Sequence, residues 1–235
     1  MTAGAWALLG LVGLLAAGDW LAVARGNMGL EYVCKPGALA ALVGVASTLD
    51  PTYGDVRAWF VLALLLSLAG DVFLMLPSDR FVAGLASFLL AHVAYVVGLT
   101  RHGGSAAFVA IAAIPVVAVA TLLGVRFLRA ARAAGQRELV GPLVAYMAVI
   151  AAMVACALAS GIALAAVGAV LFMASDALIA ETRFVGSRGA GGFADRRRRS
   201  RSLRRRPERL MTWAPVVIIV TYHLGQVGLT LSLVR

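Results

Sequence analysis

Two ionisable residues lie inside strongly apolar runs of this chain, and they are its first candidates for chemistry. Asp71 follows Gly70 in a run that ends at Pro77, and His92 lies in the run that begins at Phe81. Placing a bare charge in hydrocarbon costs on the order of several kcal/mol or more. An ionisable residue at such a position therefore indicates a functional site. The short break between the runs, residues 78–80, predicts that they are antiparallel neighbours.

A second carboxyl and a second imidazole repeat this arrangement later in the chain. Asp176 lies in another apolar run, and the run after it contains Tyr222, His223 and Gln226 within one helical turn. A buried carboxyl that stays protonated can act as a general acid, while an ionised partner acts as the base. Asp71 and Asp176 are therefore candidates for a carboxylate pair that takes part in catalysis or substrate binding.

Further polar residues within the apolar runs are expected to bind substrate or to support the pair. They are Lys35, His92, Tyr95, Tyr146, Ser175, Tyr222, His223 and Gln226. Three interpretations stay open for Lys35: its ammonium group reaches the membrane surface, pairs with a buried Asp, or binds a substrate phosphate. For the buried Asp and His residues, the alternative is that they only form hydrogen bonds between helices.

The composition predicts an integral membrane protein with one domain, residues 1–235. Hydrophobic residues make up 62% of the chain, charged residues 14%, and the mean hydropathy is +0.93. A soluble domain has roughly 45–50% apolar residues. At about 20 residues for each crossing, the sequence predicts an all-α fold of eight transmembrane helices. Their expected ranges are 5–24, 37–49, 58–76, 81–99, 106–125, 139–158, 161–180 and 211–233.

The basic residues predict the orientation of these helices in the cell membrane. With eight crossings, 18 of the 21 Lys and Arg residues fall on one side. The positive-inside rule makes that side cytoplasmic and places both termini outside the cytoplasm. The Arg-rich segment 186–209 is expected to be a disordered cytoplasmic loop that binds anionic lipid. The net charge of +10 does not indicate nucleic acid binding, because the Arg residues cluster in two connections.

The depths of the polar residues predict one polar cavity that opens toward the cytoplasm. At a rise of about 1.5 Å per residue, Asp19, Asp71 and Asp176 fall in the cytoplasmic halves of their helices. His92 and His223 fall near the middle of theirs. Because polar groups in lipid must face the interior of a bundle, we expect these side chains to converge.

Two further features bear on architecture and cofactors. The sequence Gly70-Asp71 is echoed by Ser175-Asp176 four expected helices later, which predicts a possible four-plus-four parallel duplication. The two cysteines have no CxxC spacing, and no cluster has the spacing of metal ligands. We therefore expect no disulfide framework, no metal and no other cofactor.

The motifs around these residues resemble those of the YhhN-like lysoplasmalogenase family, in order and spacing, over nearly the whole chain. They are Lys35-Pro36, Gly70-Asp71-x-x-Leu74-Met75, Phe81-x-x-Gly84-x-x-x-Phe88-x-x-x-His92-x-x-Tyr95, Gly168-Ala169-x-Leu171-Phe172-x-x-Ser175-Asp176 and Tyr222-His223-x-Gly225-Gln226. The resemblance implies an eight-helix membrane enzyme that hydrolyses the vinyl ether bond of lysoplasmalogens to a fatty aldehyde and a glycerophospho-headgroup. It also implies that Asp71 and Asp176 are the catalytic residues.

The residues present suit this chemistry. Hydrolysis of a vinyl ether needs an acid that protonates the distal alkene carbon, and a base that aims water at the carbon bearing oxygen. The competing function is a proton-coupled transporter or lipid permease, in which Asp and His form a proton relay. Transporters more often contain broken helices, and here only Pro115 interrupts an expected span deeply. The sequence therefore favours the enzyme.

Overall fold

The computed structural model describes residues 2–49, 54–78, 80–101, 105–185 and 213–234, and every regular element in those ranges is helical. The eight α-helices are α1 (Ala3–Arg25), α2 (Met28–Thr48), α3 (Gly54–Met75), α4 (Phe81–Arg101), α5 (Ala106–Ala133), α6 (Val140–Ala159), α7 (Ala163–Ala180) and α8 (Ala214–Leu231). The 3₁₀-helix η1 (Arg137–Leu139) precedes α6, and the π-helical turn η2 (Glu181–Val185) continues α7. The segment 186–209 lies outside the described residues, so its predicted disorder stays a prediction.

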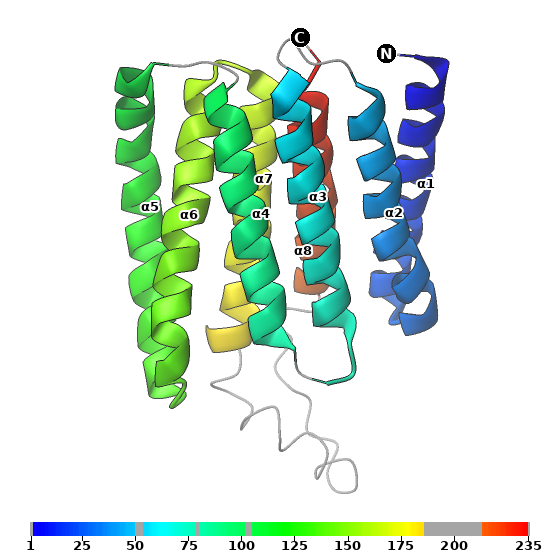
Figure 1. The fold of residues 1–235 in the computed structure, drawn as a ribbon. Coiled ribbons are helices and arrows are strands. Elements are labelled where there is room, and N and C mark those ends of the chain that lie inside the picture. Colours follow the sequence, from blue (N-terminus) through cyan, green and yellow to red (C-terminus); the bar gives the residue numbers. More distant parts are fainter. Residues whose placement is uncertain (1, 50–53, 79, 102–104, 186–212, 235) are drawn as a thin grey trace, which may run out of the picture.

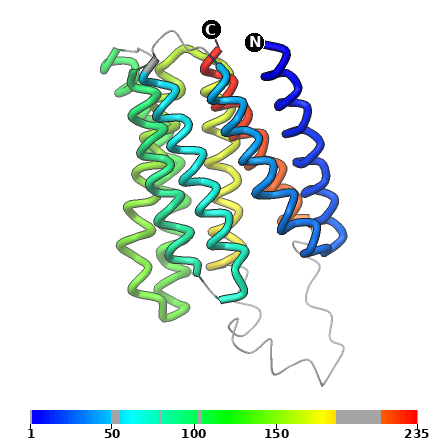
Figure 2. The backbone as a smooth tube through the Cα atoms, turned by 45° about the vertical axis from the view of Figure 1, so that its right-hand side comes forward, coloured from blue at the N-terminus to red at the C-terminus, as the bar shows by residue number. Residues whose placement is uncertain are grey.

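The helices form one antiparallel bundle with both chain ends on the same side (Figure 1). Figure 2 shows α8 beside α1 and α2, so the last helix closes the bundle against the first two. At the opposite side from the termini lie the basic ends and connections of several helices, which we call the basic end. Its members among the described residues are Arg25, Arg80, Arg126, Arg129, Arg132, Arg137 and Arg183.

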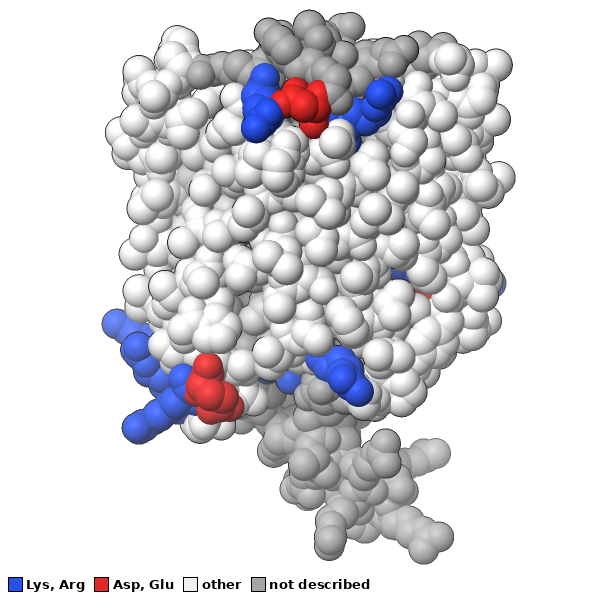
Figure 3. All heavy atoms as spheres, viewed as in Figure 1, with Lys and Arg blue, Asp and Glu red and all other residues white. Residues whose placement is uncertain are grey.

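The surface of the bundle suits a bilayer. All eight helices are long and apolar enough to cross a membrane. Large apolar side chains point outward from the outer helices, such as Leu14 at 75% exposure and Leu122 at 74%. Figure 3 shows the charged side chains gathered mainly near the two ends, with an apolar belt between them. The prediction of an all-α protein with eight transmembrane helices is therefore confirmed for the described part of the chain.

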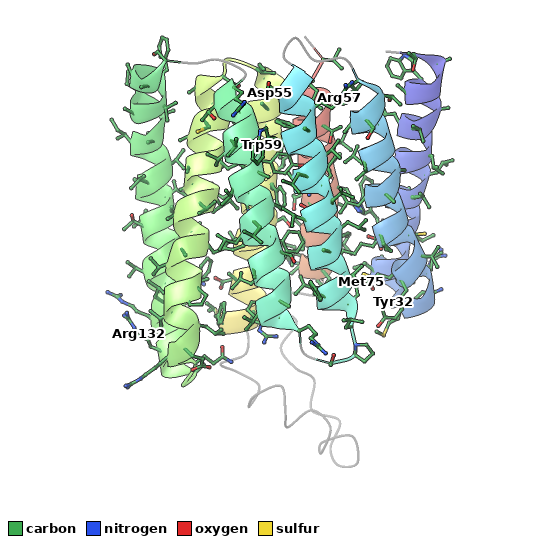
Figure 4. The ribbon with its side chains drawn as sticks, in the orientation of Figure 1. Tyr32, Asp55, Arg57, Trp59, Met75 and Arg132 are labelled. Atoms are coloured by element: carbon green, nitrogen blue, oxygen red, sulfur yellow. The ribbon has the colours of Figure 1, made fainter. Side chains whose placement is uncertain are left out.

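The second helix begins earlier than the sequence predicted. The apolar run starts at residue 37, whereas α2 starts at Met28. Asn27 caps this start, because its side chain accepts a hydrogen bond from the backbone N–H of Leu30 at 3.2 Å. The polar first turns are stabilised by contacts with α3: Tyr32 donates a hydrogen bond to the carbonyl of Met75 at 2.8 Å (Figure 4). Pro36 lies inside the helix, where it removes one backbone donor. The hydropathy pattern did not predict this start, because the first turns of α2 are polar and contain a proline.

Close contact between α7 and α8 depends on glycine. A Cβ atom on Gly168 would lie 2.6 Å from the backbone nitrogen of Leu229, and one on Gly225 would lie 2.9 Å from the backbone nitrogen of Phe172. Any side chain at either position would therefore push the two backbones apart. This close approach fixes where Phe172 of α7 lies relative to the α8 residues next to Gly225.

The helices α4 and α5 both pack on α6, and this arrangement frames the candidate site. A small apolar core of Phe127, Leu139, Leu143 and Phe184 joins α5, η1, α6 and η2 near the basic end. The larger core fills the rest of the bundle. The space between α4, α5, α6 and α7 is thus bordered by a separate cluster at its basic end.

Candidate active site

The first predicted aspartate is held in a sealed polar cluster, which we call the Asp71 site. Lys35 Nζ of α2 lies 3.1 Å from Asp71 Oδ1, and the Tyr222 hydroxyl of α8 donates a hydrogen bond to Asp71 Oδ2 at 2.6 Å. Asp71 itself is on α3 and only 2% exposed. Of the interpretations open for Lys35, the structure shows the pairing with a buried Asp. Three helices thus meet at one carboxylate.

The second predicted aspartate is held by different helices, in what we call the Asp176 site. The Tyr146 hydroxyl of α6 donates a hydrogen bond to Asp176 Oδ2 at 2.5 Å. His92 Nε2 of α4 lies 3.6 Å from the same oxygen, too far for a hydrogen bond. The Asp176 side chain is 11% exposed, and no Lys or Arg is paired with it among the described residues.

Aromatic rings connect the two sites. The Phe172 ring lies 4.7 Å from the His92 ring and 5.4 Å from the Tyr222 ring, measured between centroids. Phe88 stands edge-on to Tyr222 at 6.0 Å. A Cβ on Gly70 would lie 2.7 Å from the Phe88 ring, so glycine is required next to Asp71 for this ring to fit. The two carboxyls are therefore linked through packed rings.

Three other predicted residues make two contacts that stabilise helix pairs. The Tyr95 hydroxyl of α4 donates to Gln226 Oε1 of α8 at 2.6 Å, in a fully buried contact. The Ser175 hydroxyl donates to the carbonyl of Ile218 at 3.0 Å, which ties α7 to α8. Neither contact reaches an aspartate.

His223 lies in a third group, which includes a residue that the sequence analysis missed. Trp20 Nε1 of α1 donates a hydrogen bond to His223 Nδ1 at 3.1 Å. His223 Nε2 lies 3.9 Å from Asp19 Oδ2, and both Asp19 oxygens are buried without a hydrogen-bond partner among the described residues. Trp20 follows Asp19 directly in the sequence, and an indole N–H buried in a span was the available signal.

A pocket lies beside the Asp176 site, with about 630 Å³ of empty space, including the part open to the surroundings. Its polar lining comes from Asp176 and Tyr146. The apolar lining residues are Leu74, Phe81, Leu85, Phe88, Leu123, Leu143, Met147, Ile150, Met173, Ala177, Ile179, Ala180 and Phe184. The sequence predicted a polar cavity, but this lining is mostly apolar, because the buried polar side chains contact one another. Asp71 is not among the lining residues.

The arrangement places one carboxyl, with a phenol hydrogen-bonded to it, against an otherwise apolar pocket lining. Mostly apolar lining with a few placed polar groups is typical of small-molecule sites. Within the described residues, no group of three or more His, Cys, Asp or Glu side chains could hold a metal ion. Asp176 can exchange a proton with an apolar molecule in the pocket.

Comparisons with known proteins identify the family of the chain. A family model described as the YhhN family matches residues 30–233. Proteins named lysoplasmalogenase from Mycobacterium bovis and from Mycobacterium tuberculosis are each 33% identical to the chain, over 79% of its length and 75% of theirs. No solved structure matches the chain. The family resemblance of the motifs is thereby confirmed: this chain belongs to the YhhN family.

Proposed function

We propose that the protein is a membrane hydrolase that cleaves the vinyl ether bond of lysoplasmalogens. The observation that carries this proposal is the placement of Asp176 and Tyr146 as the polar groups of an otherwise apolar pocket. An alkenyl chain fills such a space, and a carboxyl at its wall can protonate the alkene. The names of the curated relatives support the same substrate class.

In the first step, the protonated carboxyl of Asp176 donates its proton to the distal alkene carbon. The π electrons form the new C–H bond, and the carbon that bears oxygen becomes part of an oxocarbenium ion. Negative charge on the Asp176 carboxylate then stabilises that cation in a site of low dielectric. The hydrogen bond from Tyr146 holds the carboxyl in place.

In the second step, water attacks the carbon that bears oxygen and forms a hemiacetal. We assign Asp71 as the base that receives the proton of this water, through Tyr222. The Tyr222 hydroxyl passes its own proton to Asp71 and takes a proton from the water in exchange. The hemiacetal hydroxyl then gives its proton to the Asp176 carboxylate as the bond to the glycerol oxygen breaks, and the former alkenyl chain leaves as an aldehyde. The glycerol oxygen takes the proton held by Asp71, through Tyr222, and is released as a hydroxyl, so both carboxyls return to their starting states. One water is consumed for each bond cleaved.

Release of aldehyde in detergent micelles tests this proposal against transport. The purified full-length protein is incubated with lysoplasmalogen, and aldehyde is measured over time. We expect multiple turnovers, since hydrolysis needs no separate compartments. A proton-coupled transporter or lipid permease would release no aldehyde under these conditions, and that result would overturn the proposal.

The orientation in the cell membrane also remains a proposal, with the basic end in the cytoplasm and both termini outside it. A reporter fused after Arg235 should read as non-cytoplasmic, and one fused at Gly135, in the turn after α5, as cytoplasmic. The opposite pattern would contradict the orientation. We further propose that segment 186–209 binds anionic lipid, which vesicle binding before and after replacement of its Arg residues by Ser would test.

A further inference from the structure

The pocket ends at a rim where two arginines gather. Phe81, Ala180 and Phe184 line the pocket toward the basic end, and Leu123 lines it from α5. Three described cations neighbour these lining residues: Arg80 precedes Phe81, Arg183 precedes Phe184, and Arg126 follows Leu123 by one helical turn. Arg80 is hydrogen-bonded to the Ser78 hydroxyl, whereas Arg126 pairs with Glu181 and Arg183 lies over the Phe81 ring; we call Arg126 and Arg183 the rim pair. The question is what a rim with this charge is suited to bind.

Arg183 lies over Phe81, one of the lining residues of the pocket. Its guanidinium carbon is 4.1 Å from the centroid of the Phe81 ring, a cation–π contact. Phe81 in turn stands edge-on to Phe184 at 6.1 Å. These two rings are pocket lining, so the contact fixes the Arg183 charge at the rim.

Arg126 reaches the same rim from α5. It follows Leu123 by one helical turn, on the same face of the helix, and it forms an ion pair with Glu181 of η2. The Arg126 side chain is 58% exposed, against 17% for Glu181, so the carboxylate holds one side of the guanidinium and leaves donors available. A guanidinium has five N–H donors in a planar fork, which suits a phosphate.

The spacing of Asp176 and Arg183 along the helix axis is comparable to the length of a glycerophosphate. Seven residues separate Asp176 from Arg183, which is about 10 Å along a helical backbone. In a lysoplasmalogen, seven bonds join the distal alkene carbon to phosphorus, or roughly 9 Å when extended, because bonds of about 1.5 Å advance a chain by about 1.25 Å each. A lipid whose alkene lies at Asp176 therefore brings its phosphate to the rim.

We propose that the rim pair, Arg126 and Arg183, binds the phosphate of a single-chain phospholipid substrate. This inference rests on the proposed function and adds the group that selects for a charged headgroup. Lys35 is not suited to this role, because its ammonium already pairs with the sealed Asp71 carboxylate. The rim pair therefore discriminates phosphate-bearing ether lipids from neutral alkenylglycerols.

The test compares two substrates in micelles of a neutral detergent: an alkenyl glycerophosphoethanolamine and the alkenylglycerol that lacks the phosphate. Arg126→Gln and Arg183→Gln should each raise KM for the phosphate-bearing lipid about 10-fold, the usual contribution of one charge-assisted hydrogen bond. Both should leave kinetics on the alkenylglycerol unchanged. The matched control is Arg132→Gln, an exposed cation on the same helix that points away from the bundle (Figure 4) and should change neither substrate.

Equal KM changes for both substrates, or no change for either, would overturn the proposal. Turnover of the alkenylglycerol also reports that each variant is folded. Arg183→Lys keeps the charge and should recover part of the lost affinity. Free glycerophosphoethanolamine and inorganic phosphate should inhibit turnover of the phosphate-bearing lipid only weakly, because they lack the alkenyl chain. If either competes as strongly as a lipid with a chain does, the rim is a site for free phosphate, and the proposal is overturned.

A binding assay separates failure of this inference from failure of the proposed function. A saturated alkyl ether lysophospholipid has the phosphate but no vinyl ether, so it can bind without reaction. Its affinity should fall about 10-fold in each rim variant and stay unchanged in Arg132→Gln. If wild-type protein binds this lipid in a rim-dependent way but releases no aldehyde, the proposed reaction fails and the rim site stands.

Discussion

The two aspartate sites have similar sequence surroundings but different structures. Asp71 is sealed at 2% exposure, with an ammonium group on one oxygen and a phenol on the other. Asp176 lines a pocket and has a phenol hydrogen bond on one oxygen, with an imidazole nearby. The partners on neighbouring helices make the difference. One site fits an ionised carboxylate, the base of the proposed pair, and the other fits a group that meets substrate.

The largest expected effect comes from removing the carboxyl that faces the pocket. Asp176→Asn keeps the shape of the side chain but cannot donate an acidic proton, so kcat should fall by about 10²–10⁴-fold. Aldehyde release by the purified variant measures this. The control is Asp55→Asn, which removes a carboxylate that is half-exposed and ion-paired with Arg101. Near-normal activity of Asp176→Asn would mean that the carboxyl only stabilises the bundle.

The same assay tests whether the two sites act as one unit. Asp71→Asn should also remove most of the turnover, and the double variant should be hardly slower than the slower single one, because residues that act together are non-additive. Multiplicative losses would separate Asp71 from the reaction and leave Asp176 as the one catalytic aspartate.

The next effect is on stability and is specific to the sealed site. Lys35→Met leaves the Asp71 carboxylate buried without its cation, which costs about 3–5 kcal/mol when one member of a buried ion pair is lost. The thermal midpoint in detergent should therefore fall. Adding Asp71→Asn to Lys35→Met should restore most of the stability but no activity. An unchanged midpoint in Lys35→Met would show that the pair contributes little to the folded bundle.

A smaller effect is expected from the phenols. Tyr146→Phe removes the hydrogen bond to Asp176, and the loss of a bond to a charged group, about 1.5–3 kcal/mol, should lower kcat by roughly 10- to 100-fold. Tyr95→Phe is the matched control, because that hydroxyl donates to Gln226 and touches neither aspartate. Equal losses in both variants would attribute the effect to packing.

The sequence predicted the helices well and the contacts between them only in part. Hydropathy and length identify a span, so eight helices and their alternating direction followed from composition. The position of a residue along its span does not fix which way it faces or what it meets. Lys35 against Asp71 and Tyr146 against Asp176 are contacts between helices far apart in the chain, so their geometry required the structure. The predicted four-plus-four duplication stays a prediction.

The smallest effect is expected at Asp19, which belongs with Trp20 and His223 to the third group. Within the described part of the chain, no member of this group forms a hydrogen bond with Asp71 or Asp176. Both Asp19 oxygens are buried without a hydrogen-bond partner among the described residues, and His223 Nε2 lies 3.9 Å from Asp19 Oδ2. Asp19→Asn replaces a buried carboxyl by a neutral amide, which costs less to bury. We therefore expect an equal or higher thermal midpoint and a change in kcat of no more than about 3-fold, under 1 kcal/mol. Trp20→Phe, which frees His223 Nδ1, is the companion variant and should behave similarly if this group only joins α1 to α8. A loss of 100-fold or more in Asp19→Asn, with normal folding, would move acid–base chemistry from the Asp71 site to Asp19 and His223.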